Sequence, residues 1–176
     1  MIQIKNAAEL EKMRKAAAIS AAALKAGGEA IEPGITTAEI DKIIYDFIVR
    51  HGARPNFLHL YGFPATACIS VNDTVIHGIP SRDQKIRPGD IVSIDTGCKI
   101  DGFNGDNACT FACGKVDLEA QRLLDVTKES LHLGIAAAQA GARVGDIGHA
   151  VQSYVEENGF SVVREYVGHG VGKELH

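Results

Sequence analysis

The sequence predicts an α+β fold built from two related halves, and three observations support it. Helical periodicity alternates with strand-like segments along the 176 residues. The order of helices followed by strands begins again after residue 117. Five positions recur at a constant offset of 107 residues, pairing Gly34, Ile40, Phe47, Ile48 and Gly52 with Gly141, Ile147, Tyr154, Val155 and Gly159. We therefore expect pseudo-repeat halves of about 1–107 and 108–176 within one catalytic domain, 1–176.

Capping boxes mark the starts of the first two predicted helices. Asn6 with Glu9 opens a helix expected over 7–27, because an acidic residue three positions after a capping side chain satisfies free backbone N–H groups at a helix start. Thr36 with Glu39 opens a second helix with an apolar face. The first half therefore begins with two helices.

Strands follow the second helix. Apolar residues predict strands near 67–71 and 75–79. Alternation of apolar and polar residues over 91–95, followed by an Asp-Gly turn at 99–102, predicts a hairpin that returns over 103–111. This hairpin is the most regular strand pattern in the chain.

The second half repeats the order of two helices followed by strands, but fewer of its strands are expected. Helical periodicity covers the residues after Asp117 up to Gly141 and again 146–158, and 160–167 has the composition of a strand. Residue 176 corresponds to residue 69 of the first half, so we expect the second half to lack a counterpart of the hairpin.

Two aspartates of the hairpin are candidate metal ligands. If the loop centres between Ile100 and Asp101, Asp95 and Asp106 are directly opposed on one face, with Cβ atoms about 4.5–5.5 Å apart. Opposed like charges are destabilising, and two carboxylates at that separation can hold divalent ions. The pattern alone leaves open both a metal site and an ordinary solvated pair.

Three histidines have patterns that fit a site. His169 lies between glycines, which allow close approach, and neutral imidazole is a common metal ligand; His176 follows seven residues later. His77 lies in an apolar segment, where an unpartnered imidazole is costly. For His77 a satisfied core histidine and a functional histidine both remain open.

Composition excludes several classes of protein. A net charge of −4, a pI near 6.0 and no cluster of Lys and Arg argue against nucleic-acid binding. No apolar targeting segment or membrane span is present, and the four cysteines do not form a disulfide framework. These features predict a cytoplasmic, non-membrane protein.

Four segments together resemble the bacterial type I methionine aminopeptidases: VIHGIP at 75–80, IVSID at 91–95, DGFNGD at 101–106 and YVGHGVGKELH at 166–176. The resemblance runs along essentially the whole chain. It implies the pita-bread fold, two pseudo-symmetric halves around a curved antiparallel sheet, with the second half incomplete. It also implies removal of the initiator methionine from nascent proteins and peptides by two-metal hydrolysis, with two divalent ions (Co, Mn, Fe, Zn or Ni not distinguishable).

The resemblance assigns roles to individual residues. Asp95, Asp106 and His169 are implied metal ligands, and His77 and His176 are implied catalytic residues that also contact the substrate. The remaining residues matching the methionine pocket are Phe57, Leu60, Phe63, Cys68 and Leu175.

The resemblance also implies binding partners and an incomplete set of metal ligands. The partners would be a peptide or nascent-protein N-terminus that starts with Met, with the ribosome as a further partner and the protein a monomer. The family's two glutamate ligands would lie beyond residue 176, so we expect this chain by itself to bind metal weakly and to have little activity. The alternatives are an inactive pita-bread module that binds peptide N-termini, and a related metallopeptidase such as an X-Pro peptidase.

Overall fold

The computed structural model describes residues 3–176, which form two compact units. The first contains the residues up to Val116 together with His169–His176, and the second is Asp117–Gly168. No helix within the described part of the chain is both long and apolar enough to cross a membrane.

Two capped helices open the first unit, as the sequence predicts. Helix α1 spans Ala7–Glu29 and α2 spans Thr37–Arg50. At the start of α1 the Asn6 side chain accepts a hydrogen bond from the Glu9 amide, and the Glu9 carboxylate accepts one from the Asn6 amide. Both predicted capping boxes are present, and α1 extends two residues past its predicted end at residue 27.

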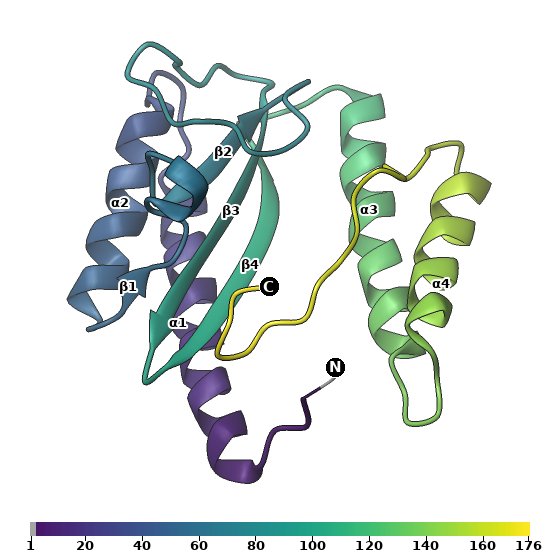
Figure 1. Cartoon of the computed structure of the whole chain (residues 1–176). Coiled ribbons are helices and arrows are strands. Elements are labelled where there is room, and N and C mark those ends of the chain that lie inside the picture. Colours follow the sequence, from purple (N-terminus) through teal and green to yellow (C-terminus); the bar gives the residue numbers. More distant parts are fainter. Residues whose placement is uncertain (1–2) are drawn as a thin grey trace. The chain divides into compact units, whose positions relative to one another are not determined.

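A small antiparallel sheet follows, with strands β1 (Arg54–Pro55), β2 (Ala67–Val71), β3 (Ile91–Ile100) and β4 (Phe103–Ala112). Strand β3 is central: β4 pairs along one side, and β1 and β2 pair with different parts of the other (Figure 1). A short 3-10 helix, η1 (Leu60–Gly62), lies in the loop before β2.

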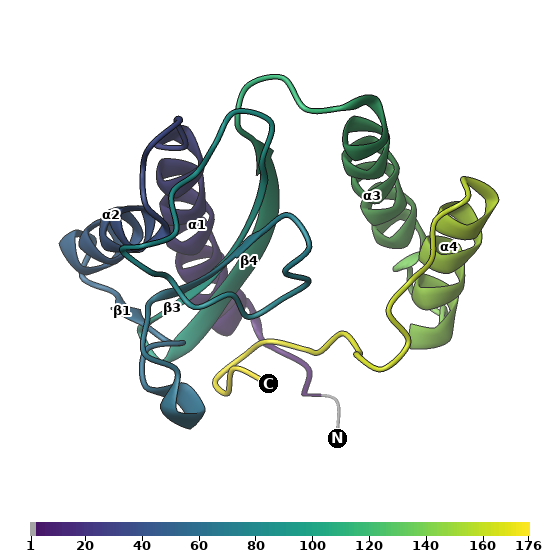
Figure 2. The same ribbon diagram turned by 90° about the horizontal axis from the view of Figure 1, so that it is seen from above.

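The hydrophobic core lies between this sheet and the two helices, which cover one of its faces (Figure 2). Ile40, Ile44 and Ile48 recur along one face of α2 and are fully buried, and they share a cluster with Val92 and Ile94 of β3. Burying each such side chain stabilises the fold by about 1.5–3 kcal/mol before entropy is counted. The other face of β3 and β4 is left free to carry polar groups.

The register of the hairpin differs from the prediction. The loop is formed by Asp101 and Gly102, both with positive φ (53° and 83°), as a two-residue type I′ turn requires. Gly97 is therefore the residue opposite Asp106, and Asp95 lies opposite Ala108. The prediction that Asp95 and Asp106 are directly opposed was therefore wrong, by two residues along the strand. Since side chains alternate with a period of two, a two-residue shift keeps both on one face, so that part is confirmed.

The predicted strand over 75–79 is absent from the described structure, which has a loop there. His77 has φ 57°, which no strand residue adopts, and Val75 and Ile79 are 66% and 57% exposed. The segment meets β2 only around Gly78, whose carbonyl accepts from the Ile69 amide at 2.8 Å and whose amide donates to Ser70 Oγ at 3.0 Å. An apolar composition alone could not distinguish this loop from a strand.

The second unit is a pair of helices, α3 (Leu118–Ala137) and α4 (Val144–Glu157). The same 107 residues separate α2 from α4 at both ends. All of residues 160–167 are described and none is a strand, so that prediction was wrong. A strand needs a hydrogen-bonded neighbour, and the described residues of this unit provide none.

One glycine of β4 permits close packing of α1 on the sheet. A Cβ added to Gly105 would lie 2.4 Å from the Ala16 carbonyl oxygen and 2.5 Å from its carbon. Both are backbone atoms of α1, so no side chain could move aside. Helix α1 and strand β4 therefore require glycine at this position.

We predict that Gly105→Ala lowers the free energy of unfolding by about 1–3 kcal/mol, because the added methyl group must push α1 from the sheet. Urea unfolding followed by circular dichroism measures this. Gly148→Ala in α4 is the matched control: its Cβ would meet nothing within 4 Å, and alanine favours helix by up to about 1 kcal/mol. Equal stability of Gly105→Ala and the parent chain would contradict the packing argument.

Candidate metal centre

Asp95 and Asp106 lie on the face of the hairpin that points away from α1 and α2. The alternate positions in each strand face the helices: the Cys98 thiol in β3 donates to the Ala16 carbonyl of α1 at 3.5 Å, and Gly105 in β4 packs on Ala16. Strand alternation therefore places the two aspartates together on the opposite face. The Asp106 side chain is only 16% exposed.

Burial raises the cost of ionising both carboxyl groups, and Asp106 adds to the cost for Asp95. Burial, the Asp106 charge and a hydrogen bond with Asp106 raise the pKa of Asp95 to about 7. Burial also raises the pKa of Asp106, although His169, Asp95 and His176 act in the opposite direction. Two partly buried carboxylates with no cation between them are electrostatically strained, because desolvation and like charge both disfavour the ionised forms.

The last eight residues bring two histidines to this pair. His169 Nε2 lies 3.6 Å from Asp106 Oδ2, and the His169 and His176 rings are 4.6 Å apart in an edge-to-face arrangement. His169 Nδ1 lies 3.2 Å from the Gly170 carbonyl oxygen, so a proton on Nδ1 would be hydrogen-bonded there and Nε2 is the ring nitrogen directed at Asp106. Residues more than sixty positions apart in the sequence thus meet at one point.

Cys68 belongs to the same cluster. It lies opposite Asp95 in the register of β2 and β3 and is 7% exposed. Burial and the charges of Asp95, Asp106 and Asp41 raise the pKa of its thiol to about 12. The side chain is therefore a protonated, soft, apolar wall of the site rather than an anionic ligand.

The other residues predicted to line the methionine pocket lie in the loop around η1 and in the C-terminal segment. Phe57, Leu60 and Phe63 share the loop around η1, where the Phe63 amide donates to the Leu60 carbonyl at 2.9 Å and the Leu60 amide to that of Phe57 at 2.9 Å. Phe57 is buried, and Leu60, Phe63 and Leu175 are half-buried.

His77 is exposed in the loop beside β2, so the interpretation as a satisfied core histidine was wrong. The loop turns at His77 itself, which adopts a left-handed backbone. Among the described residues its ring makes no hydrogen bond and no ion pair with Asp95 or Asp106.

Asp95, Asp106 and His169 are the right types of ligand for a divalent cation, but they are too few to enclose one. Two carboxylates and an imidazole are ligands that Mn²⁺, Co²⁺, Fe²⁺ and Zn²⁺ accept. Within residues 3–176, however, no three His, Cys, Asp or Glu side chains already surround one point closely enough to enclose an ion. Asp95, Asp106 and His169 therefore form a partial ligand set.

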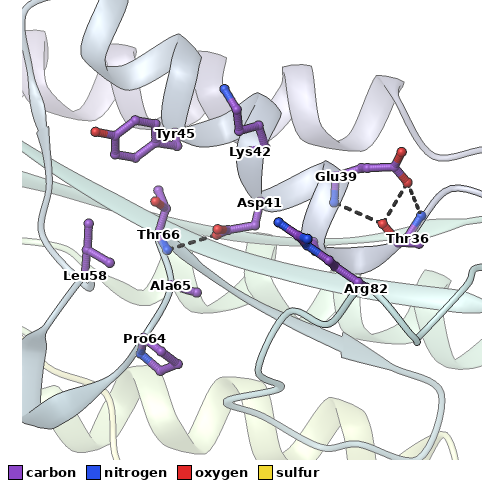
Figure 3. Close-up of a pocket in the computed structure, with 11 residues that line it drawn as sticks. Thr36, Glu39, Asp41, Lys42, Tyr45, Leu58, Pro64, Ala65, Thr66 and Arg82 are labelled. Carbon is purple, nitrogen blue, oxygen red and sulfur yellow. Dashed lines mark hydrogen bonds between the residues drawn. The ribbon is translucent and has the colours of Figure 1, made fainter.

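A cavity of the first unit is not lined by the aspartate pair. It has a volume of about 560 Å³ beside α2 and is lined by Tyr45, Leu58, Pro64 and Arg82 among others (Figure 3). Asp41 closes one wall, where its carboxylate accepts from the Thr66 and Ala67 amides at 2.9 and 2.8 Å. That contact holds the start of β2 in place, and the aspartate pair does not line this cavity.

Sequence reasoning missed one residue close to the site. Asn104, two positions before Asp106 on the same face of β4, is 3% exposed and its side-chain amide bonds to the backbone of residues 172 and 173. Nothing local in the sequence marks it, since its partners lie almost seventy positions away. The burial of the Asn104 side chain and its hydrogen bonds could be recognised only from the folded structure.

Comparison with known proteins places the chain in a family. The model described as metallopeptidase family M24 matches residues 11–176. The methionine aminopeptidase of Clostridium acetobutylicum is 48% identical over 176 residues, which cover 100% of this chain and 70% of that protein.

Solved structures agree. The methionine aminopeptidase of Thermotoga maritima superimposes with a TM-score of 0.97 at 40% identity, over 100% of this chain and 71% of that one. An Xaa-Pro dipeptidase from Bacillus anthracis gives 0.83 at 24% identity, over 98% of this chain and 47% of that one, and so shares the fold alone. These matches confirm the predicted pita-bread fold.

We predict that Asp95→Asn stabilises the metal-free protein at high pH. Between about pH 4 and pH 7 the unfolded chain has released the Asp95 proton whereas the folded chain keeps it, so stability falls as pH rises through this window. The variant cannot ionise and escapes that loss, by about 1–3 kcal/mol at pH 8 and much less at pH 4.5.

Urea unfolding in the presence of a chelator at the two pH values measures the difference. Asp46→Asn is the control, because Asp46 forms an exposed ion pair with Lys42. The difference in free energy of unfolding between Asp46→Asn and the parent should change by less than about 0.5 kcal/mol between the two pH values. If the stability difference between Asp95→Asn and the parent did not depend on pH, the Asp95 carboxylate would not be destabilising the folded state as we predict.

Proposed function

The chain belongs to metallopeptidase family M24 and, within it, to the bacterial methionine aminopeptidases, and from this membership we propose that it removes the N-terminal methionine from peptides and nascent proteins by metal-dependent hydrolysis. The observation that carries the proposal is the meeting of Asp95, Asp106 and His169 on the free face of the hairpin. Nothing about core packing requires three ionisable groups there. A divalent cation explains them, because it neutralises the two carboxylates and accepts the imidazole.

In this proposal Asp95, Asp106 and His169 hold two divalent ions, drawn from Co, Mn, Fe, Zn and Ni. Asp106 would be the central member of this ligand set, since it contacts His169 on one side and Asp95 on the other. When bound, such ions polarise a peptide carbonyl and lower the pKa of a coordinated water toward about 7. The protein's own part is to fix these side chains on a rigid hairpin and to hold the substrate beside them.

The methionine side chain is proposed to bind against Cys68, with Phe57, Leu60, Phe63 and Leu175 completing an apolar pocket. The burial of Cys68 and its position opposite Asp95 support this, since a thioether packs well on a soft, uncharged wall.

His176 is proposed to donate a hydrogen bond to the carbonyl oxygen under attack, and its contact with His169 supports a place beside that atom. His77 is proposed to lie near the scissile amide, and its exposed loop beside β2 leaves it free to reach a substrate. The proposed substrates include nascent chains, with the ribosome as the setting and a monomer as the working form.

We predict that Co²⁺ or Mn²⁺ supports slow release of free methionine from Met-Ala-Ser by this chain, while Ala-Pro-Ser stays intact. Chromatography of the products measures both. Asp106→Asn should abolish release, because it removes the carboxylate that contacts both Asp95 and His169 in the proposed ligand set, whereas Asp101→Asn, in an exposed pair with Lys15, should not change it. Alanine release from Ala-Pro-Ser would instead identify an X-Pro peptidase. Peptide binding without any release would identify a binding module.

We also predict weak metal binding by the polypeptide of residues 1–176 used alone. The part of the chain that the structure describes supplies only a partial ligand set, and loss of ligands lowers affinity steeply. A titration followed by Co²⁺ absorption should give a dissociation constant at least about tenfold above that of a longer relative, with correspondingly slow turnover. Turnover equal to that of the relative would contradict this prediction.

A further inference from the structure

The C-terminal segment His169–His176, here called the strap, is fastened to the hairpin by one buried side chain. Asn104 Nδ2 donates to the Gly172 carbonyl at 3.0 Å and to the Lys173 carbonyl at 3.1 Å. The Asn104 backbone amide also donates to the Gly172 carbonyl at 2.9 Å. Three hydrogen bonds thus join one residue of β4 to two adjacent residues of the strap.

A second asparagine fixes the orientation of this amide. Asn56 Nδ2 donates to Asn104 Oδ1 at 3.4 Å, which leaves the Asn104 NH₂ group directed at the strap. The Asn56 backbone is held in turn, since its amide donates to the Gly97 carbonyl at 3.2 Å. Gly97 makes room for this arrangement: a Cβ there would lie 2.4 Å from Asn56 Oδ1.

The anchor lies between the two histidines of the strap. Gly172 follows His169 by three residues, and His176 follows Lys173 by three. Asn104 and Asp106 are two apart on β4 and face the same side, so the strap is held one side chain away from the carboxylate that His169 contacts. Both imidazoles therefore take their positions from this attachment.

Two further attachments of the strap, both made by lysine side chains, are exposed. Lys99 Nζ donates to the Lys173 carbonyl at 2.7 Å, and Lys173 Nζ lies 3.1 Å from the Glu9 carboxylate with its side chain 62% exposed. Exposed ion pairs contribute little, because water screens them and long side chains lose freedom. Asn104, at 3% exposure, makes hydrogen bonds from which water is excluded.

We propose that Asn104 is a positioning residue that acts through the strap to hold His169 and His176 against Asp106. The inference rests on the proposed metal-dependent function and adds a residue that touches neither the proposed ions nor the substrate. Side chains that orient a metal ligand from behind typically change metal affinity by about 10- to 100-fold when removed. Asn104 has that relation to His169, through the backbone of the strap.

Metal-free nuclear magnetic resonance tests the attachment. In the parent, the His169 and His176 rings are close enough for an Overhauser contact. Asn104→Ala should abolish this contact and speed exchange of the Gly172 amide, which donates to the Glu174 carbonyl, by at least about tenfold, while amides of α1 and β3 stay protected. Asn104→Leu, which fills the volume without the donors, should do the same. Asn107→Ala is the matched control: its amide donates to Ala17 on the opposite face of β4.

A double-mutant cycle with Co²⁺ separates positioning from general weakening. Asn104→Ala should raise the Co²⁺ dissociation constant about 10- to 100-fold. In the His169→Ala background the same change should have almost no further effect, because it acts through an imidazole already removed. Additive losses would overturn the proposal, and so would an unchanged ring contact and unchanged strap exchange in Asn104→Ala. Absence of Co²⁺ binding by the parent would overturn the proposed function, and the metal-free experiment would still decide the role of Asn104.

Discussion

The two-residue turn of Asp101 and Gly102 is the local feature on which the site depends. Its two positive φ values set the register of β3 and β4, and that register decides which side chains share a face. A slip by one residue would turn one strand over and separate Asp95 from Asp106. The helices α1 and α2 cover the other face, so the turn also decides which face remains free for chemistry.

The aspartate pair is costly to the fold in the absence of a cation. Both groups are partly buried, and the raised pKa of Asp95 expresses the resulting strain. Functional sites commonly retain such strain, because the groups that destabilise the empty fold are the ones that bind the ligand. The core of Ile40, Ile44 and their neighbours supplies the rigid support that makes this tolerable.

The strap shows how a distant segment completes the site. Its backbone joins no sheet, and glycines give it little intrinsic preference for one conformation. Hydrogen bonds from buried groups such as Asn104 therefore have to specify its path. The chain spans about 70% of the methionine aminopeptidase to which it was compared, and its ligands in the described residues come from one hairpin and one loop.

Local patterns in the sequence determined much of this protein. Capping boxes located α1 and α2, apolar composition located β2, alternation located the hairpin, and the spacing of Asp95 and Asp106 put them on one face. These features depend on neighbours a few residues away, and so they can be recognised in the chain itself. Composition alone could not decide the loop around His77 or residues 160–167, because a strand exists only where a partner is available. The meeting of His169 with Asp106 and the anchoring by Asn104 were decided by tertiary structure, since each depends on contacts between residues that only folding brings together.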